Sequence, residues 1–158
     1  MLFVLSGVAV LGGGTGVYAA TGDSPVPDRV RVRKDTEPLL RRFRPVGQLS
    51  DPRWLGFNPN DSGREPIPDQ DPQIRVVGIA QLPAGAATSI VGSPAYGFAL
   101  GSPPKVPEML EQFLPEHPEW MSSPRYDRYI TKSVYQGQFH FDQSSDCVYF
   151  DTLNPEVV

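Results

Sequence analysis

Hydrophobic and polar residues alternate in two runs near the end of the chain, residues 133–141 and 147–153. Alternation with a period of two is typical of strands that bury one face. The polar segment between the runs, Asp142-Gln143-Ser144-Ser145, favours a turn. The pattern therefore predicts a β-hairpin.

Pairing of His140 with Cys147 across a four-residue loop would sort the side chains of this hairpin into two faces. One face is apolar and consists of Phe139, Phe141, Val148 and Phe150. The other face is mainly polar and consists of Gln136, Gln138, His140, Cys147, Tyr149 and Asp151. Because large apolar side chains are costly to leave in water, we expect the first face to close the core of the domain.

Three more strands are predicted from composition and alternation. Residues 73–82 are dense in β-branched residues and predict a central strand, whereas residues 53–57 and the alternating residues 29–33 predict shorter ones. Residues 58–72 and 92–107 are rich in Gly and Pro, so we expect them to form loops.

Three short helices are expected. Asp35 or Thr36 can cap the first, which would bury Leu39 and Phe43 before Pro45 ends it. Residues 84–91 predict the second helix. The third would begin at Pro107 and end at Pro115, and its apolar stripe consists of Met109, Leu110, Phe113 and Leu114.

This order of elements predicts a single α+β domain over residues 28–155, followed by a short tail at residues 156–158. We expect an antiparallel or mixed sheet with short helices packed on one face. The length of 158 residues agrees with one domain of ordinary size.

Residues 1–20 carry no charge. An uncharged segment of this length can cross the hydrocarbon of a bilayer as a helix. These residues predict either a cleaved signal peptide or a retained transmembrane anchor, and a buried strand or helix of a soluble protein is the less favoured alternative. Residues 21–27 are expected to form a linker. The two favoured alternatives place the domain at the cell membrane or outside the cell.

The charge of the chain is unevenly distributed. Overall, 14 basic and 18 acidic residues give a net charge of −4, which argues against a nucleic-acid partner. Half of the basic residues nevertheless fall in one block: Arg29, Arg31, Arg33, Lys34, Arg41, Arg42 and Arg44. Such a block could contact anionic lipid or an anionic envelope polymer. The plainer interpretation, which the predicted strand and helix favour, is a solvated face neutralised by the chain's own acids.

Cys147 and His140 are the candidate catalytic residues, because a Cys–His pair near carboxylates can form an activated nucleophile. The sequence supplies no recognisable oxyanion hole or pocket, so a structural role is favoured. A single cysteine excludes an intrachain disulfide. Because the two histidines, His117 and His140, fall on different elements, we expect no metal site, and no cofactor motif is present.

These observations favour a non-enzymatic interaction or envelope-surface module. Its partners would be the membrane, through the N-terminal segment, and an anionic lipid, an envelope polymer or an unidentified protein. The alternative is a small Cys-dependent enzyme that uses Cys147 and His140.

Residues 33–39, Arg-Lys-Asp-Thr-Glu-Pro-Leu, together with Arg42-Phe43 and Trp54-Leu55-Gly56, resemble small actinobacterial exported or membrane-associated proteins. The excess of Arg over Lys suits a GC-rich genome of that kind. The resemblance implies export and an unassigned role, and it supplies no catalytic residue.

Export is directly testable. Because residues 1–20 are uncharged, a C-terminally tagged full-length chain expressed with its native upstream region should be recovered in the membrane or extracellular fraction. Recovery entirely in the cytosol would contradict the prediction.

Overall fold

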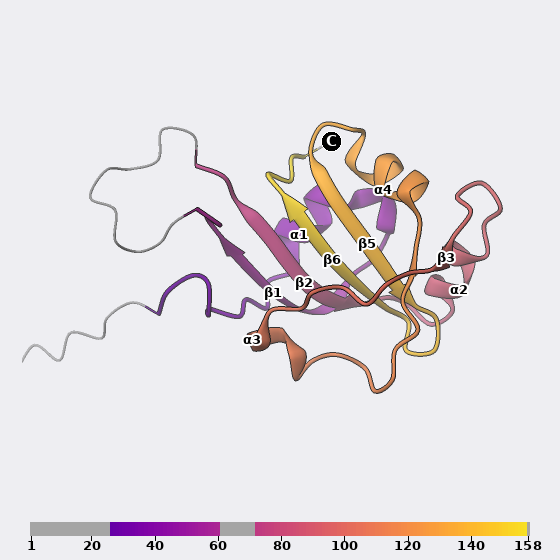
Figure 1. The fold of residues 1–158 in the computed structure, drawn as a ribbon, viewed down its shortest axis with the longest axis horizontal. Coiled ribbons are helices and arrows are strands. Elements are labelled where there is room, and N and C mark those ends of the chain that lie inside the picture. Colours follow the sequence, from indigo (N-terminus) through magenta and orange to yellow (C-terminus); the bar gives the residue numbers. More distant parts are fainter. Residues whose placement is uncertain (1–25, 61–71, 158) are drawn as a thin grey trace, which may run out of the picture.

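Six antiparallel strands form one open sheet in the order β1-β2-β6-β5-β4-β3 (Figure 1). The protein is represented by a computed structural model that describes residues 26–60 and 72–157, so the predicted segment 1–20 lies outside the described residues. The strands are β1 (Ser50–Phe57), β2 (Arg75–Gln81), β3 (Ala99–Leu100), β4 (Met121–Ser122), β5 (Gln136–Asp142) and β6 (Cys147–Leu153). The helices are α1 (Glu37–Arg42), α2 (Ala86–Val91), α3 (Glu108–Glu111) and α4 (Pro124–Thr131), with a 3-10 turn η1 (Arg44–Val46) after α1. The predicted α+β class is confirmed.

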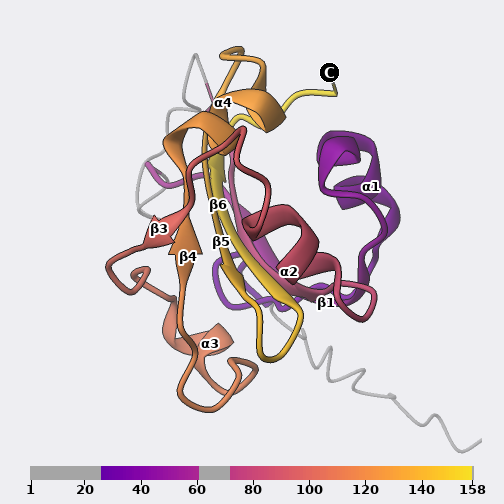
Figure 2. The same ribbon diagram turned by 90° about the vertical axis from the view of Figure 1, so that its right-hand side faces the viewer.

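One face of the sheet carries the larger core. The predicted apolar residues of the hairpin lie here, and Leu39 of α1, Ala87 of α2 and Ile130 of α4 pack against them. Phe43 follows α1 and contacts two hairpin rings, Phe139 and Phe150, at centroid distances of 5.3 and 5.1 Å. Figure 2 shows α1 and α2 on this side of the sheet.

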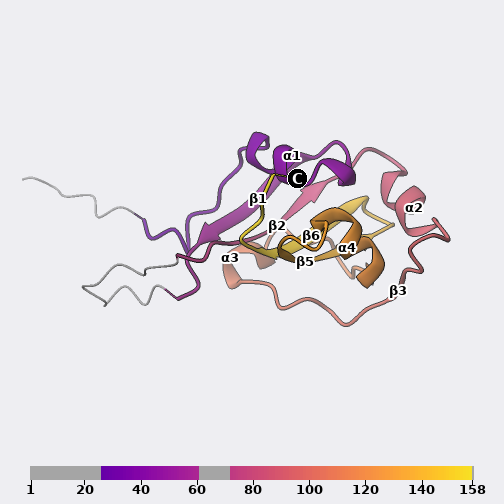
Figure 3. The same ribbon diagram turned by 90° about the horizontal axis from the view of Figure 1, so that it is seen from above.

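The opposite face carries a second, smaller core. Leu110 of α3 and Trp120 cover Val77, Ile79 and the fully buried Tyr149. Figure 3 shows α1 on one side of the sheet and the segment between β3 and α3 running along the other. The expected one-sided arrangement of helices is therefore wrong for α3. The reason is that the interior strand β2 is apolar on both faces, and each face needs a cover.

The hairpin register differs from the prediction by two residues. β5 and β6 pair Asp142 with Cys147 and His140 with Tyr149, so the proposed His140–Cys147 pairing is wrong. A shift of two preserves the alternation, so the predicted apolar face is correct. The turn explains the shift, since the Asp142 carboxylate accepts hydrogen bonds from the Ser145 backbone N–H and from the Ser144 and Ser145 hydroxyls. These bonds close a loop of residues 143–146 immediately after Asp142.

Two local predictions need correction. Residues 29–33 do not form a strand, and only Arg33 makes a single bridge, to Trp54 of β1. The region 92–107 was expected to be a loop but contains β3. Among the predicted helices, α1 and α2 form close to the expected bounds, whereas α3 is one turn long.

The sequence pattern did not predict α4 or β4. The signal for α4 is Ser123-Pro124: the Ser123 hydroxyl accepts from the Tyr126 backbone N–H at 3.2 Å, and Pro124 occupies the first turn. Tyr126 and Ile130 lie one turn apart on α4, and both side chains pack against the larger core. Among the helices of residues 26–60 and 72–157, none has the length and apolar character to cross a bilayer.

The aromatic core generates a stability prediction. Phe139→Ala or Phe150→Ala should lower the free energy of unfolding by about 3–5 kcal/mol, because each removes a buried ring that packs on Phe43. Gln138 is exposed on the other face of β5, so Gln138→Ala should change the free energy of unfolding by less than about 0.5 kcal/mol. Urea unfolding measures both, and equal losses at Phe139 and Gln138 would show that the assigned faces are wrong.

Candidate functional site

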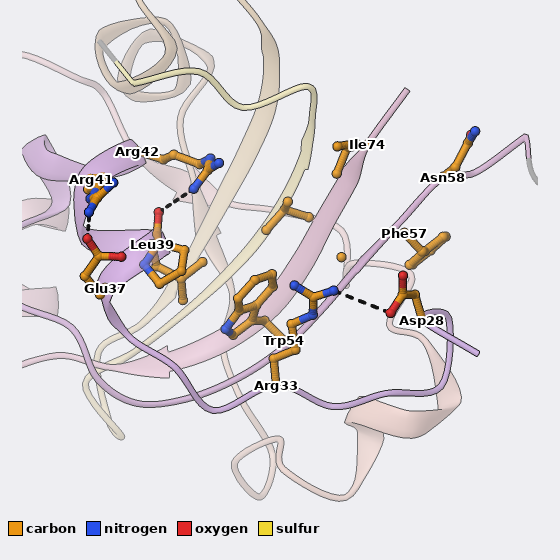
Figure 4. A pocket seen from close by; sticks show the side chains of 13 residues that line it. Asp28, Arg33, Glu37, Leu39, Arg41, Arg42, Trp54, Phe57, Asn58 and Ile74 are labelled. Atoms are coloured by element: carbon orange, nitrogen blue, oxygen red, sulfur yellow. Dashed lines mark hydrogen bonds and ion pairs between the residues drawn. The ribbon is translucent and has the colours of Figure 1, made fainter. Parts of the chain in front are cut away.

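A groove of about 540 Å³ opens between α1 and the neighbouring ends of β1 and β2 (Figure 4). Its lining combines basic, acidic and apolar side chains. These are Asp28, Arg33, Glu37, Pro38, Leu39, Arg41, Arg42, Trp54, Gly56, Phe57, Asn58, Ile74 and Val76. The groove therefore has an apolar floor with charged groups around it.

Arg33 occupies the centre of this groove in Figure 4. Its backbone N–H donates to the Trp54 carbonyl at 2.7 Å, and its carbonyl accepts from the Trp54 N–H at 3.1 Å. The guanidinium then lies over the Trp54 ring, with Cζ 5.0 Å from the ring centroid, a cation–π contact. Backbone and side chain of Arg33 are thus both held against the same tryptophan.

Trp54 itself is fixed by its neighbours. It is 4% exposed, and its indole N–H donates to the Asp35 carbonyl at 2.9 Å. Gly56 leaves room for the Trp54 ring and the Arg33 guanidinium. A Cβ at this position would lie 3.0 Å from the Trp54 ring and 3.9 Å from the Arg33 Cζ. Gly78, opposite Trp54 on β2, is needed as well, since a Cβ there would come within 2.5 Å of β1 atoms.

The Arg33 guanidinium has few polar partners. Its Nη2 reaches Asp28 Oδ1 at 3.5 Å, which is long for a charged hydrogen bond. Its Nε is buried and has no hydrogen-bond partner among residues 26–60 and 72–157. Arg33 is therefore a positioned cation with unused donor capacity.

Of the seven basic residues predicted to contact an anion, the structure brings Arg33, Arg41 and Arg42 to the groove. Arg41 forms an ion pair with Glu37 one turn earlier on α1. Arg42 donates to the Pro38 carbonyl at 2.9 Å and to the Pro155 carbonyl at 3.0 Å. Their donors are thus partly committed within the chain.

The other four basic residues, Arg29, Arg31, Lys34 and Arg44, do not line the groove. Arg29 donates to the Pro59 carbonyl at 2.8 Å, and Arg31 lies 4.0 Å from Asp28. The basic block of the sequence is therefore divided in space, and Arg33 is its best-positioned member.

Cys147 and His140 are not joined by a hydrogen bond. The Cys147 Sγ instead donates to the Gln81 Oε1 at 3.3 Å. Burial raises the pKa of this thiol, and the charges of Asp142 and Asp146 act in the same direction, although a hydrogen bond with Ser145 opposes them. The thiol form is favoured at neutral pH, which is the opposite of what a nucleophile needs.

The carboxylates near Cys147 have structural partners. Asp142 closes the hairpin turn, and Asp146 accepts from the Gly85 and Ala87 backbone N–H groups at 2.9 and 3.1 Å, which caps α2 from a distance. Asp151 forms a two-pronged ion pair with Arg75 at 2.9 and 2.6 Å. Within the described part of the chain, no group of three His, Cys, Asp or Glu could hold a metal ion.

Fold and groove together define an α+β protein with a cationic, tryptophan-floored groove. Comparisons with protein-family models, with curated proteins and with solved structures found no match. The sequence pattern identified the basic residues but not Trp54, which positions Arg33. The signal that points to Trp54 is a tryptophan followed two residues later by glycine in one strand, because a glycine leaves room for the Arg33 side chain beside the ring.

The environment of Cys147 predicts its reactivity. A thiol-reactive probe should label the native protein slowly below about pH 9 and much faster after unfolding in urea, because burial protects the thiol and raises its pKa. Labelling rates measured across pH test this, with the unfolded chain as control. A thiolate that forms well below pH 8 would favour the Cys-dependent enzyme instead.

Proposed function

We propose that the protein is a non-enzymatic binding module of the cell envelope, exported or tethered by its N-terminal segment, whose groove binds an anionic lipid head group. The observation that carries this proposal is the Arg33 guanidinium, held over Trp54 with a buried Nε that lacks a partner among the described residues. No catalytic group is required for such a role.

The chemistry of Arg33 supports an anionic ligand. A guanidinium offers five N–H donors in a plane, a geometry that matches the oxygens of a phosphate. The single 3.5 Å contact with Asp28 leaves most of these donors for a ligand. A phosphate would also supply a partner for the buried Nε, which has none among the described residues.

The apolar floor favours a lipid over a hydrophilic polymer. Leu39, Trp54 and Val76 line the same groove, and Ile74 at its rim is half exposed. A lipid can place its phosphate on Arg33 and the start of an acyl chain on Ile74 and the partly exposed Phe57. A polyanion without apolar groups would leave these two side chains in water, at a cost of about 25 cal/mol per Å² of apolar surface.

The position of the groove in the chain is compatible with a membrane ligand. Eight peptide units separate Ala20 from Asp28 at the groove, and an extended chain spans at most about 3.5 Å per residue. A retained anchor would therefore keep Asp28 within roughly 28 Å of the membrane surface.

The test compares two arginines of equal charge. With residues 26–158 shown to be folded by circular dichroism, flotation with phosphatidylglycerol-containing vesicles should exceed flotation with phosphatidylcholine vesicles. Arg33→Gln should weaken binding about fivefold, the equivalent of roughly 1 kcal/mol per basic residue. Arg44→Gln, which removes the same charge outside the groove, should leave it nearly unchanged.

Equal losses in the two variants would show diffuse attraction and contradict a groove ligand. Binding to soluble polyphosphate that depends on Arg33, without binding to vesicles, would replace the lipid with an envelope polymer. Arg33→Lys should bind weakly as well, because lysine keeps the charge but lacks the planar guanidinium that stacks on Trp54.

A further inference from the structure

A second cavity, of about 450 Å³, lies on the opposite face of the sheet from the main core. Its floor is formed by side chains of three strands: Arg75 of β2, Gln138 and His140 of β5, and Asp151 of β6. The segment after β3 and the first turn of α4 form the walls, which include Lys105 and Asp127. The volume falls within the range of small-ligand sites.

His140 is the unusual residue of this cavity. It is 8% exposed, and both ring nitrogens are buried without a hydrogen-bond partner among residues 26–60 and 72–157. Burial lowers the pKa of the imidazole, although the nearby Asp151 raises it, so the ring is neutral at pH 7. A neutral imidazole has one donor and one acceptor, and leaving both unpaired in the interior is costly.

The charges around the cavity are balanced. Arg75 and Asp151 form the two-pronged ion pair across the floor, and Lys105 and Asp127 contribute one charge of each sign from the walls. β4 pairs with β5 only at His140 and Phe141, and one Asp127 oxygen accepts from the unpaired Phe139 backbone N–H beyond them at 3.0 Å. Burial raises the pKa of Asp127 to about 6, so this carboxyl is mainly ionised at pH 7 and accepts hydrogen bonds.

The walls are held in place by the fold. The Tyr149 hydroxyl donates to the Lys105 carbonyl at 3.2 Å, which fixes the segment after β3 across the sheet. Pro103, Pro104 and Pro124 also line the cavity and restrict the backbone of both walls. The cavity is therefore a built feature and not a gap between mobile loops.

We propose that this cavity binds a neutral polyhydroxylated ligand, namely a saccharide unit. One sugar hydroxyl can donate to the unprotonated His140 nitrogen and a second can accept from its N–H, while neighbouring hydroxyls match the Gln138 amide and the Asp127 carboxylate. The balanced charges give no advantage to an anion or a cation. This site is independent of the groove at Arg33, which lies on the other face and carries unused positive charge.

The experiment titrates the full chain, in a detergent without a sugar head group, with N-acetylglucosamine, glucuronate and glucosamine. Nuclear magnetic resonance of the Gln138 side-chain amide and the His140 ring nitrogens reports binding. N-acetylglucosamine at about 10 mM should shift both sets of signals, if the dissociation constant is near 1 mM. The charged sugars should bind more weakly.

Two variants locate the site. His140→Phe keeps an aromatic ring but removes both nitrogens, so binding should fall more than tenfold while the urea midpoint stays the same or rises. Gln138→Ala, at an exposed position, should weaken binding about fivefold. The matched control Gln48→Ala, exposed and outside the cavity, and Arg33→Gln in the groove should bind as the unaltered chain does.

The proposal is overturned if N-acetylglucosamine leaves the Gln138 and His140 signals unchanged, or if glucuronate binds more tightly than the neutral sugar. Unaltered binding by Gln138→Ala would also overturn it. That variant decides the question even if His140→Phe fails to fold.

Discussion

The fold depends on two of its interior strands, β2 and β6, which present apolar side chains to both faces of the sheet. An interior strand of this kind cannot leave either face in water, because each buried aliphatic or aromatic side chain is worth about 1.5–3 kcal/mol. The remaining segments of this short chain must then pack against both faces of the sheet. The helices α1, α2 and α4 take one face, and α3 with Trp120 takes the other.

This division explains where the two candidate sites arise. Both sites extend to the end of the sheet at which β2 begins, near Arg75. On the larger-core face the groove lies between α1 and the strands β1 and β2, and on the other face the cavity lies under the segment after β3 and the first turn of α4. Each opening thus lies where a short helix or an irregular segment meets the sheet.

The sequence predicted those parts of the fold that depend on local alternation. The two faces of the hairpin, the central position of β2 and the burial of Leu39 and Phe43 all follow from side-chain periodicity, which the backbone geometry enforces. The pairing register did not follow, because it is set by the hydrogen bonds of one carboxylate, Asp142, and alternation is identical for registers two residues apart. Likewise, α4 depends on a single cap at Ser123, and its eight residues are too few for a clear stripe.

The candidate sites were harder to predict than the fold, because tertiary packing decides which partners a polar side chain has. A count of charges identified seven basic residues but not the groups that contact them. Those contacts decide which basic side chain can still bind a ligand. Arg41 is engaged by Glu37 one turn away, whereas Arg33 is separated by 21 residues from Trp54, the ring that holds it.

His140 shows the converse case. Its strand pattern assigns it to a polar, solvent-facing side, yet Trp120 and the segment around Lys105 cover that side. A polar residue on such a face becomes buried without acquiring a partner, since no local rule in the sequence provides one. Unpaired polar groups of this type are created by tertiary packing alone, and so the residues most suggestive of ligand binding are those that periodicity describes least well.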